Sequence, residues 1–80
     1  MVQVMEMSSS DRVVLARLAR SMVAPHRKVI AARALLALAD GKSVRSTAAA
    51  LGSYPNTVTR WRDRYLAEGV DAVGVIAPGR

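Results

Sequence analysis

The stretch LGSYPNTVTRWRDRY, residues 51–65, decides the fold of this chain. An apolar helical pattern ends at its first residues, and a second helical pattern begins near Pro55. The residues between them, GSY (52–54), have the length of the connection in a helix-turn-helix, whose turn often contains glycine. Pro55 suits the first position of a helix, where a missing N–H carries no penalty. The stretch therefore predicts a helix-turn-helix.

The flanking sequence predicts two more helices before this pair. In SSSDRVVLARLARSM (8–22), Ser9 or Ser10 suits the N-cap, and an apolar face runs through Leu15, Leu18 and Met22. In PHRKVIAARALLALADG (25–41), a helix beginning at Pro25 carries the apolar stripe Ile30, Ala34, Leu35 and Leu38 and ends at Gly41.

The helix-turn-helix itself is expected to occupy SVRSTAAALG (43–52) and YPNTVTRWRDRYLAEG (54–69). Ser43 is the expected N-cap, and Val44, Thr47, Ala48 and Leu51 share one face. The second helix has the inner stripe Val58, Trp61 and Tyr65 and ends at Gly69. The fold class is all-α, a small bundle of about four helices with a homeodomain-like helix-turn-helix. We expect a flexible tail over 1–9, the DNA-binding domain over 10–69 and a linker over 70–80 toward an absent C-terminal domain.

The charge of the chain favours a polyanionic partner. Its 80 residues fit one domain and include 12 Lys and Arg against 6 Asp and Glu, a formal net charge of +6. Such an excess points to nucleic acid, and the alternative is a solubilising surface. The absence of cysteine excludes disulfides and Cys-based zinc sites and fits a reducing cytoplasm, so a cytoplasmic, nucleoid-associated location is expected. The longest apolar stretch, VIAARALLALA (29–39), is too short for a membrane span, so no membrane partner is expected.

Trp61 is expected in the core, because it shares the helical spacing of Val58 and Tyr65, although base stacking is an alternative. The polar residues around it then point outward. In a helix-turn-helix, the second helix enters the major groove, where Asn reads adenine and Arg reads guanine through paired hydrogen bonds. The expected base contacts are Pro55, Asn56, Thr59, Arg60 and Asp63. The alternative is a solvated charged face.

Phosphate contacts are expected from the cationic and hydroxyl side chains around this helix. Arg27 and Lys28 stand near a helix start, where cations oppose the helix dipole and a bound anion would reverse the penalty. The alternative for this pair is a solvated surface screened by salt. The full expected set is Arg27, Lys28, Lys42, Arg45, Ser53, Tyr54, Thr57, Arg62 and Arg64.

No catalytic chemistry is indicated. His26 is the only histidine and has no metal-ligand companion at helical spacing, and the six carboxylates are scattered. No glycine-rich loop follows a strand, so no nucleotide cradle is predicted. We expect no cofactor, no metal and no enzymatic activity in this chain.

From about Ser10 to Arg80, the chain resembles the N-terminal DNA-binding region of bacterial insertion-sequence transposases of the mariner superfamily. The resemblance lies in LARLARSMVAPHRKVIAARALLALADGKSV, then TAAALGSYPNTVTRWRDRYLAEGV, then the terminal PGR. The family's recognition helix commonly reads Asn-Thr-Val-x-x-Trp-Arg, as 56–62 does here. Two departures stand out: Ser53 and Tyr54 replace an apolar residue and a capping Ser in the turn, and Ser46 with Thr47 replaces Glu-Ile, which removes a capping-box partner for Ser43.

The resemblance implies binding to the terminal inverted repeats of a mobile element. It also implies a following catalytic domain in which three carboxylates hold two metal ions, and a linker whose Arg80 enters the minor groove. Two other functions remain open. One is a stand-alone transcription regulator or phage-type repressor, and the other is a protein-interaction module that dimerises through Val70–Ile76 or Val2–Met5.

Overall fold

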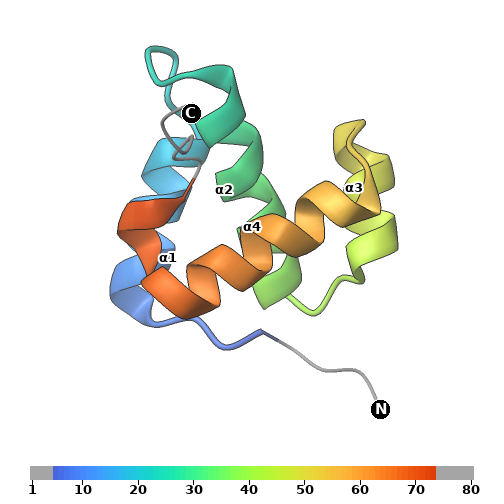
Figure 1. Cartoon of the computed structure of the whole chain (residues 1–80). Helices are drawn as coiled ribbons and strands as arrows, with labels where there is room; N and C mark the ends of the chain where they lie inside the picture. The colour runs from blue at the N-terminus through green and yellow to red at the C-terminus, as the bar shows by residue number, and fades with distance from the viewer. Residues whose placement is uncertain (1–4, 74–80) are drawn as a thin grey trace, which may run out of the picture.

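The computed structural model describes residues 5–73, which form four α-helices and a short 3₁₀ turn, with no strand (Figure 1). The helices confirm the predicted all-α class. Their bounds are α1 (Ser9–Ala19), α2 (His26–Ala39), α3 (Val44–Leu51), α4 (Pro55–Glu68) and the 3₁₀ turn η1 (Val70–Ala72).

α2 is the central helix of the bundle. It contacts α1, α3 and α4, whereas α1 and α3 do not touch and lie on different sides of the molecule (Figure 1). Its buried residues point in several directions, as expected of a helix that is apolar nearly all round. These residues are Val29, Ala31, Ala32, Ala34, Leu35, Leu38 and Ala39. Three of the four residues in the predicted stripe are buried, and Ile30 is only partly covered.

The core consists of two clusters on different sides of α2. The first contains Leu15, Ala19, Ala31, Ala32, Leu35, Tyr65 and Val73. The second contains Ala34, Leu38, Ala48 and Val58. Trp61 packs against both clusters, as expected of a core tryptophan, and its side chain stays half-exposed.

α1 differs from the sequence prediction at both ends. Its N-cap is Ser8, whose Oγ accepts a 3.1 Å hydrogen bond from the Asp11 N–H, rather than Ser9 or Ser10. The helix stops at Ala19, and Met22 is 98% exposed, so placing Met22 on the apolar face was wrong. The reason is local. Ser21 Oγ accepts hydrogen bonds from the N–H groups of residues 23 and 24 at 3.2 and 2.9 Å, and this turn competes with the helix.

α2 also begins one residue later than predicted. Pro25 is its N-cap and His26 its first residue, with no side-chain hydrogen bond at the cap and no acidic residue in the first turn. The end of α1 is fastened to α2 by Arg33, whose Nε donates a 3.3 Å hydrogen bond to the Ala19 carbonyl. At the other end of α2, Arg12 forms a 3.1 Å ion pair with Asp40.

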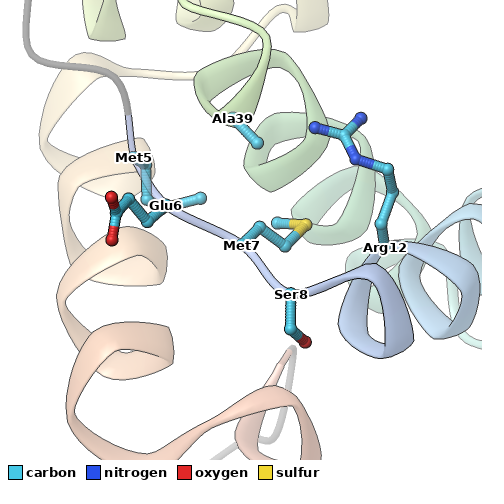
Figure 2. A pocket seen from close by; sticks show the side chains of 6 residues that line it. All are labelled: Met5, Glu6, Met7, Ser8, Arg12 and Ala39. Carbon is cyan, nitrogen blue, oxygen red and sulfur yellow. The ribbon is translucent and has the colours of Figure 1, made fainter.

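The packed body extends past both expected boundaries, residues 10 and 69. Met5 and Met7 are partly buried against the core, and with Glu6, Ser8, Arg12 and Ala39 they line a shallow pocket of about 470 Å³ between α1 and the end of α2 (Figure 2). At the other end, Gly69 has φ 88° and turns the chain back. As a result η1 packs on α1 and α4, and Val73 joins the core. The expected linker residues 74–80, with Arg80, and the tail residues 1–4 lie outside the described residues.

No helix within residues 5–73 is both long enough and apolar enough to cross a bilayer.

Candidate nucleic-acid interface

The turn between α3 and α4 has the geometry that the sequence predicted. Ser43 caps α3, since its Oγ accepts a 3.0 Å hydrogen bond from the Ser46 N–H. Gly52 ends α3 in the left-handed region, at φ 66°, and the next N–H, of Ser53, donates a 2.9 Å hydrogen bond back to the Ala48 carbonyl. Two helices joined by three residues are thereby held at a fixed angle.

The two departures from the transposase pattern have visible structural outcomes. Tyr54 is the N-cap of α4 but makes no side-chain capping bond; its carbonyl accepts from Thr57 and Val58 instead, and its ring is exposed. Ser46, which stands where the family has a capping-box Glu, still interacts with Ser43, because its Oγ donates a 3.3 Å hydrogen bond to the Ser43 carbonyl. The turn therefore forms without either family residue.

One face of α4 carries all five expected base contacts. Asn56, Arg60 and Asp63 follow the spacing i, i+4 and i+7, which places them in a line along a helix. All three are exposed, Thr59 is half-exposed beside them, and Pro55 is exposed at the helix start. The opposite face, with Val58 and Tyr65, is buried. α4 therefore presents an exposed polar row along one face, opposite its buried face.

The arginines of α4 differ in their partners. Arg62 contacts Asp63 through both Nε and Nη2 at 3.3 Å, and Arg64 lies 3.6 Å from Glu68. Arg60 has no carboxylate partner within residues 5–73. Exposed pairs of this kind contribute little stability. Arg60 is thus the one arginine of α4 without an ion pair among the described residues.

The start of α2 lies beside the turn between α3 and α4. The two together line an open groove of about 420 Å³. Its lining residues are His26, Arg27, Ile30, Leu51, Gly52, Ser53, Thr57 and Trp61. Three expected phosphate contacts, Arg27, Ser53 and Thr57, therefore converge on one concave surface, although they come from three different elements.

The groove is electropositive for two reasons. Arg27 is exposed there, and the first turn of α2, with its positive dipole end, has neither a side-chain cap nor an acidic residue. His26 and Trp61 were not predicted for this surface. No sequence signal could have placed them, because the approach of α2 to the turn is a tertiary contact.

The other expected phosphate contacts do not enter this groove. Lys42 is exposed in the connection between α2 and α3, Arg45 is exposed in the first turn of α3, and Lys28 is half-buried on α2.

A single hydrogen bond holds the carboxyl half of α4 to α1. The Tyr65 hydroxyl donates to Asp11 Oδ2 at 2.6 Å. Burial, followed by the hydrogen bond to Asp11 and the negative charge of Asp11, raises the pKa of the Tyr65 hydroxyl to about 12. The hydroxyl therefore stays protonated, and the bond stays in place, throughout the neutral range.

Within residues 5–73, no three His, Asp or Glu side chains gather closely enough to hold a metal ion.

A family model described as a homeodomain-like domain matches residues 25–74 of the chain. The matched range begins at the N-cap of α2 and includes α3, the turn, α4 and η1, whereas α1 precedes it. No curated protein matches the chain, and no solved structure does.

Proposed function

This chain belongs to the homeodomain-like family, and from that membership we propose that it recognises a specific double-stranded DNA sequence through α4. The family carries the helix-turn-helix, a DNA-binding motif, and the four helices observed here have that architecture. In the proposed complex, α4 lies in the major groove with Pro55 and Asn56 leading.

The observation that carries this proposal is the exposed row Asn56, Arg60 and Asp63 on α4. Asn56 has the amide that pairs with an adenine edge, and Arg60 has the guanidinium that pairs with guanine. Neither residue supports the fold, since both are exposed and their neighbours Val58 and Tyr65 provide the packing. An exposed row of this composition fits base reading better than a merely solvated face.

Phosphate contacts in this proposal flank the recognition helix. Arg27, Ser53 and Thr57 surround the groove at the start of α2, and Lys42 and Arg45 extend the positive surface beyond α3. Tyr54, exposed at the start of α4, has a hydroxyl that reaches outward. Such contacts fix the register of the protein on the duplex without reading its sequence.

The biological site we propose is the terminal inverted repeat of a mobile element. The support is the ordered resemblance to mariner-superfamily transposases over TAAALGSYPNTVTRWRDRYLAEGV. In this proposal, the present chain only binds DNA, and the chemistry of transposition belongs to a separate catalytic domain.

Selection of bound duplexes from a random library, at about 150 mM salt, tests the proposal. We expect the native chain to enrich one motif. The variant Asn56→Ala should enrich it less sharply, and the control variant Arg17→Ala, on α1, should enrich it as well as the native chain does. Enrichment of no motif by the folded protein would overturn sequence-specific recognition.

The same experiment separates a transposase from a regulator. Inverted copies of the motif at both ends of the element that encodes the chain would support terminal-repeat recognition. A single copy near a promoter would instead assign the chain to the transcription regulators.

A further inference from the structure

A second exposed surface lies on α1, away from α3. Val13, Arg17 and Arg20 follow the spacing i, i+4 and i+7 along α1 and its C-cap, and Met22 and Val23 follow directly in the loop. We call these five residues the α1 surface. Val13 is 56% exposed, and Met22 and Val23 are 98% and 96% exposed. Three large apolar side chains thus stand in water beside two arginines.

The loop part of this surface is held in a defined shape. Ser21 Oγ accepts from both the Val23 and the Ala24 N–H, and Pro25 follows with its fixed φ. Arg33 fastens the preceding helix end through the Ala19 carbonyl. Met22 and Val23 are therefore presented by an ordered turn, and little chain entropy would be lost when a partner covers them.

The charges of the α1 surface are uncompensated. Arg12 pairs with Asp40, but no carboxylate within residues 5–73 pairs with Arg17 or Arg20. Residues 1–4 (MVQV) and 74–80 (GVIAPGR) contain no Asp or Glu either. Two copies of this surface brought together would place four arginines close to one another. An acidic partner would supply the missing negative charges.

The apolar residues favour a protein over a nucleic acid as this partner. A surface that meets DNA is mostly polar and cationic, whereas a protein-binding patch combines large apolar side chains and methionine with arginine. The α1 surface is also set apart from the exposed row of α4, because α1 makes no contact with α3 and meets α4 at its buried face, through side chains such as Tyr65 (Figure 1). It would therefore stay accessible while α4 occupies a major groove.

We propose that the α1 surface docks an acidic, amphipathic segment of a partner protein, whose apolar side chains cover Val13, Met22 and Val23 and whose carboxylates pair with Arg17 and Arg20. This interaction does not depend on DNA recognition, so a chain that failed to select a DNA motif would still show it.

The test is a titration of the ¹⁵N-labelled chain with a synthetic helical peptide. The peptide carries Leu at i, i+3, i+4 and i+7 and Glu on the flanking positions, and a matched peptide has Gln in place of Glu. We expect amide shift changes confined to residues 13–23 with the Glu peptide, with affinity about tenfold weaker for the Gln peptide. Shifts centred on residues 56–63 would overturn the proposal, because the peptide would then be acting as a substitute for DNA.

Variants separate the two halves of the surface. The double variant Arg17→Glu/Arg20→Glu should weaken the Glu peptide about tenfold or more, and Met22→Ser/Val23→Ser should weaken both peptides. Arg45→Glu, an exposed arginine on α3, is the matched control and should leave peptide binding unchanged. All these positions are exposed, so folding should be retained, and circular dichroism checks it. Equal weakening by Arg45→Glu, or no weakening by the Arg17/Arg20 variant, would overturn the proposal.

Discussion

Tyr65 on the inner face of α4 and Asp11 in the first turn of α1 are joined by a 2.6 Å hydrogen bond across 54 residues of chain. No Cα atom of α1 lies within 8 Å of α4, so the two helices meet only through side chains. The tyrosine ring belongs to the larger core cluster, and its hydroxyl reaches past that cluster to the carboxylate. The bond therefore holds the carboxyl half of α4 against α1.

Replacing Tyr65 with Phe should destabilise the fold by about 1–2 kcal/mol, because a hydrogen bond to a charged acceptor is lost while the ring stays packed. Urea unfolding followed by circular dichroism measures the difference. Asp11→Asn is the companion variant, since an amide oxygen still accepts from the hydroxyl, and a smaller loss is expected. A larger loss for Asp11→Asn than for Tyr65→Phe would mean that Asp11 acts mainly through the helix dipole.

The same bond gives stability a dependence on alkaline pH. The pKa of Tyr65 is raised from 10.0 to about 12 in the folded chain, so folding favours the protonated hydroxyl. Its contribution is complete below about pH 10 and is lost as pH rises toward 12. The difference in unfolding free energy between the native chain and Tyr65→Phe should therefore shrink over this window. A constant difference from pH 8 to 12 would contradict the assignment.

Asn56→Ala and Arg60→Ala should each weaken the preferred DNA site by about 1–3 kcal/mol and relax the preference at one base position. Both side chains are exposed on α4, so the thermal midpoint of the free protein should stay nearly the same. Fluorescence anisotropy with the preferred duplex and with single-base variants measures both effects. If Asn56→Ala weakened every duplex equally, Asn56 would be a backbone contact and not a base reader.

Binding should weaken steeply with salt. If about six phosphates are neutralised, the slope of log K against log salt should be near −5. Lys42→Ala and Arg45→Ala should each reduce the magnitude of that slope by about 1 and weaken all sequences alike. Arg17→Ala, on the far side of α2 from α3, is the control and should leave the slope unchanged. A slope that Lys42→Ala and Arg45→Ala leave intact would remove these two residues from the interface.

Gly52→Ala should destabilise the fold by about 1 kcal/mol or more, because Gly52 adopts φ 66°, which a residue with a Cβ adopts only at a penalty. No atom lies within 4 Å of the added Cβ, so the loss would come from the backbone and not from a clash. Gly52→Asn should lose less, because asparagine tolerates this region. Urea midpoints compare the two variants, and an equal loss for both would point to a cause other than backbone conformation.

Thr47→Val should stabilise the fold by about 1 kcal/mol, because the Thr47 side chain is 1% exposed and its Oγ1 has no hydrogen-bond partner. Valine has nearly the same shape and removes the unsatisfied oxygen. Thr47→Ser is the matched variant: it keeps the hydroxyl, removes a methyl group and should destabilise by about 1 kcal/mol. A lower unfolding midpoint for Thr47→Val than for the native chain would show that the hydroxyl has a partner in solution.

The helix-turn-helix was predictable because its signals are local. Ser43, Gly52, Pro55 and Gly69 each act through bonds or backbone angles within a few residues of themselves, and each occupies the expected position in the structure. The polar row on α4 was predictable for the same reason, since helical spacing alone places Asn56 and Arg60 on one face. Their contact with DNA bases stays a prediction.

What the sequence did not predict depends on contacts between distant segments. Met22 continues the spacing of Leu15 and Leu18, yet a hydroxyl one residue earlier starts a turn and ends the helix. The groove beside the turn exists because α2 approaches it, and the half-exposed Trp61 lines this groove while it packs against both core clusters. The sequence places Val73 in the expected linker. In the structure the chain reverses at Gly69, and Val73 therefore packs in the core.

The helix that precedes the family match, α1, matters for any truncation of the chain or transfer of its DNA-binding motif to another protein. The match begins at residue 25, yet Leu15 and Ala19 of α1 belong to the larger core cluster with Leu35 and Tyr65. A fragment trimmed to residues 25–74 would expose that cluster to water and lose the anchor of Tyr65. The range that matches the family model is therefore shorter than the segment that forms the packed core. Grafting experiments should include α1 together with the helix-turn-helix.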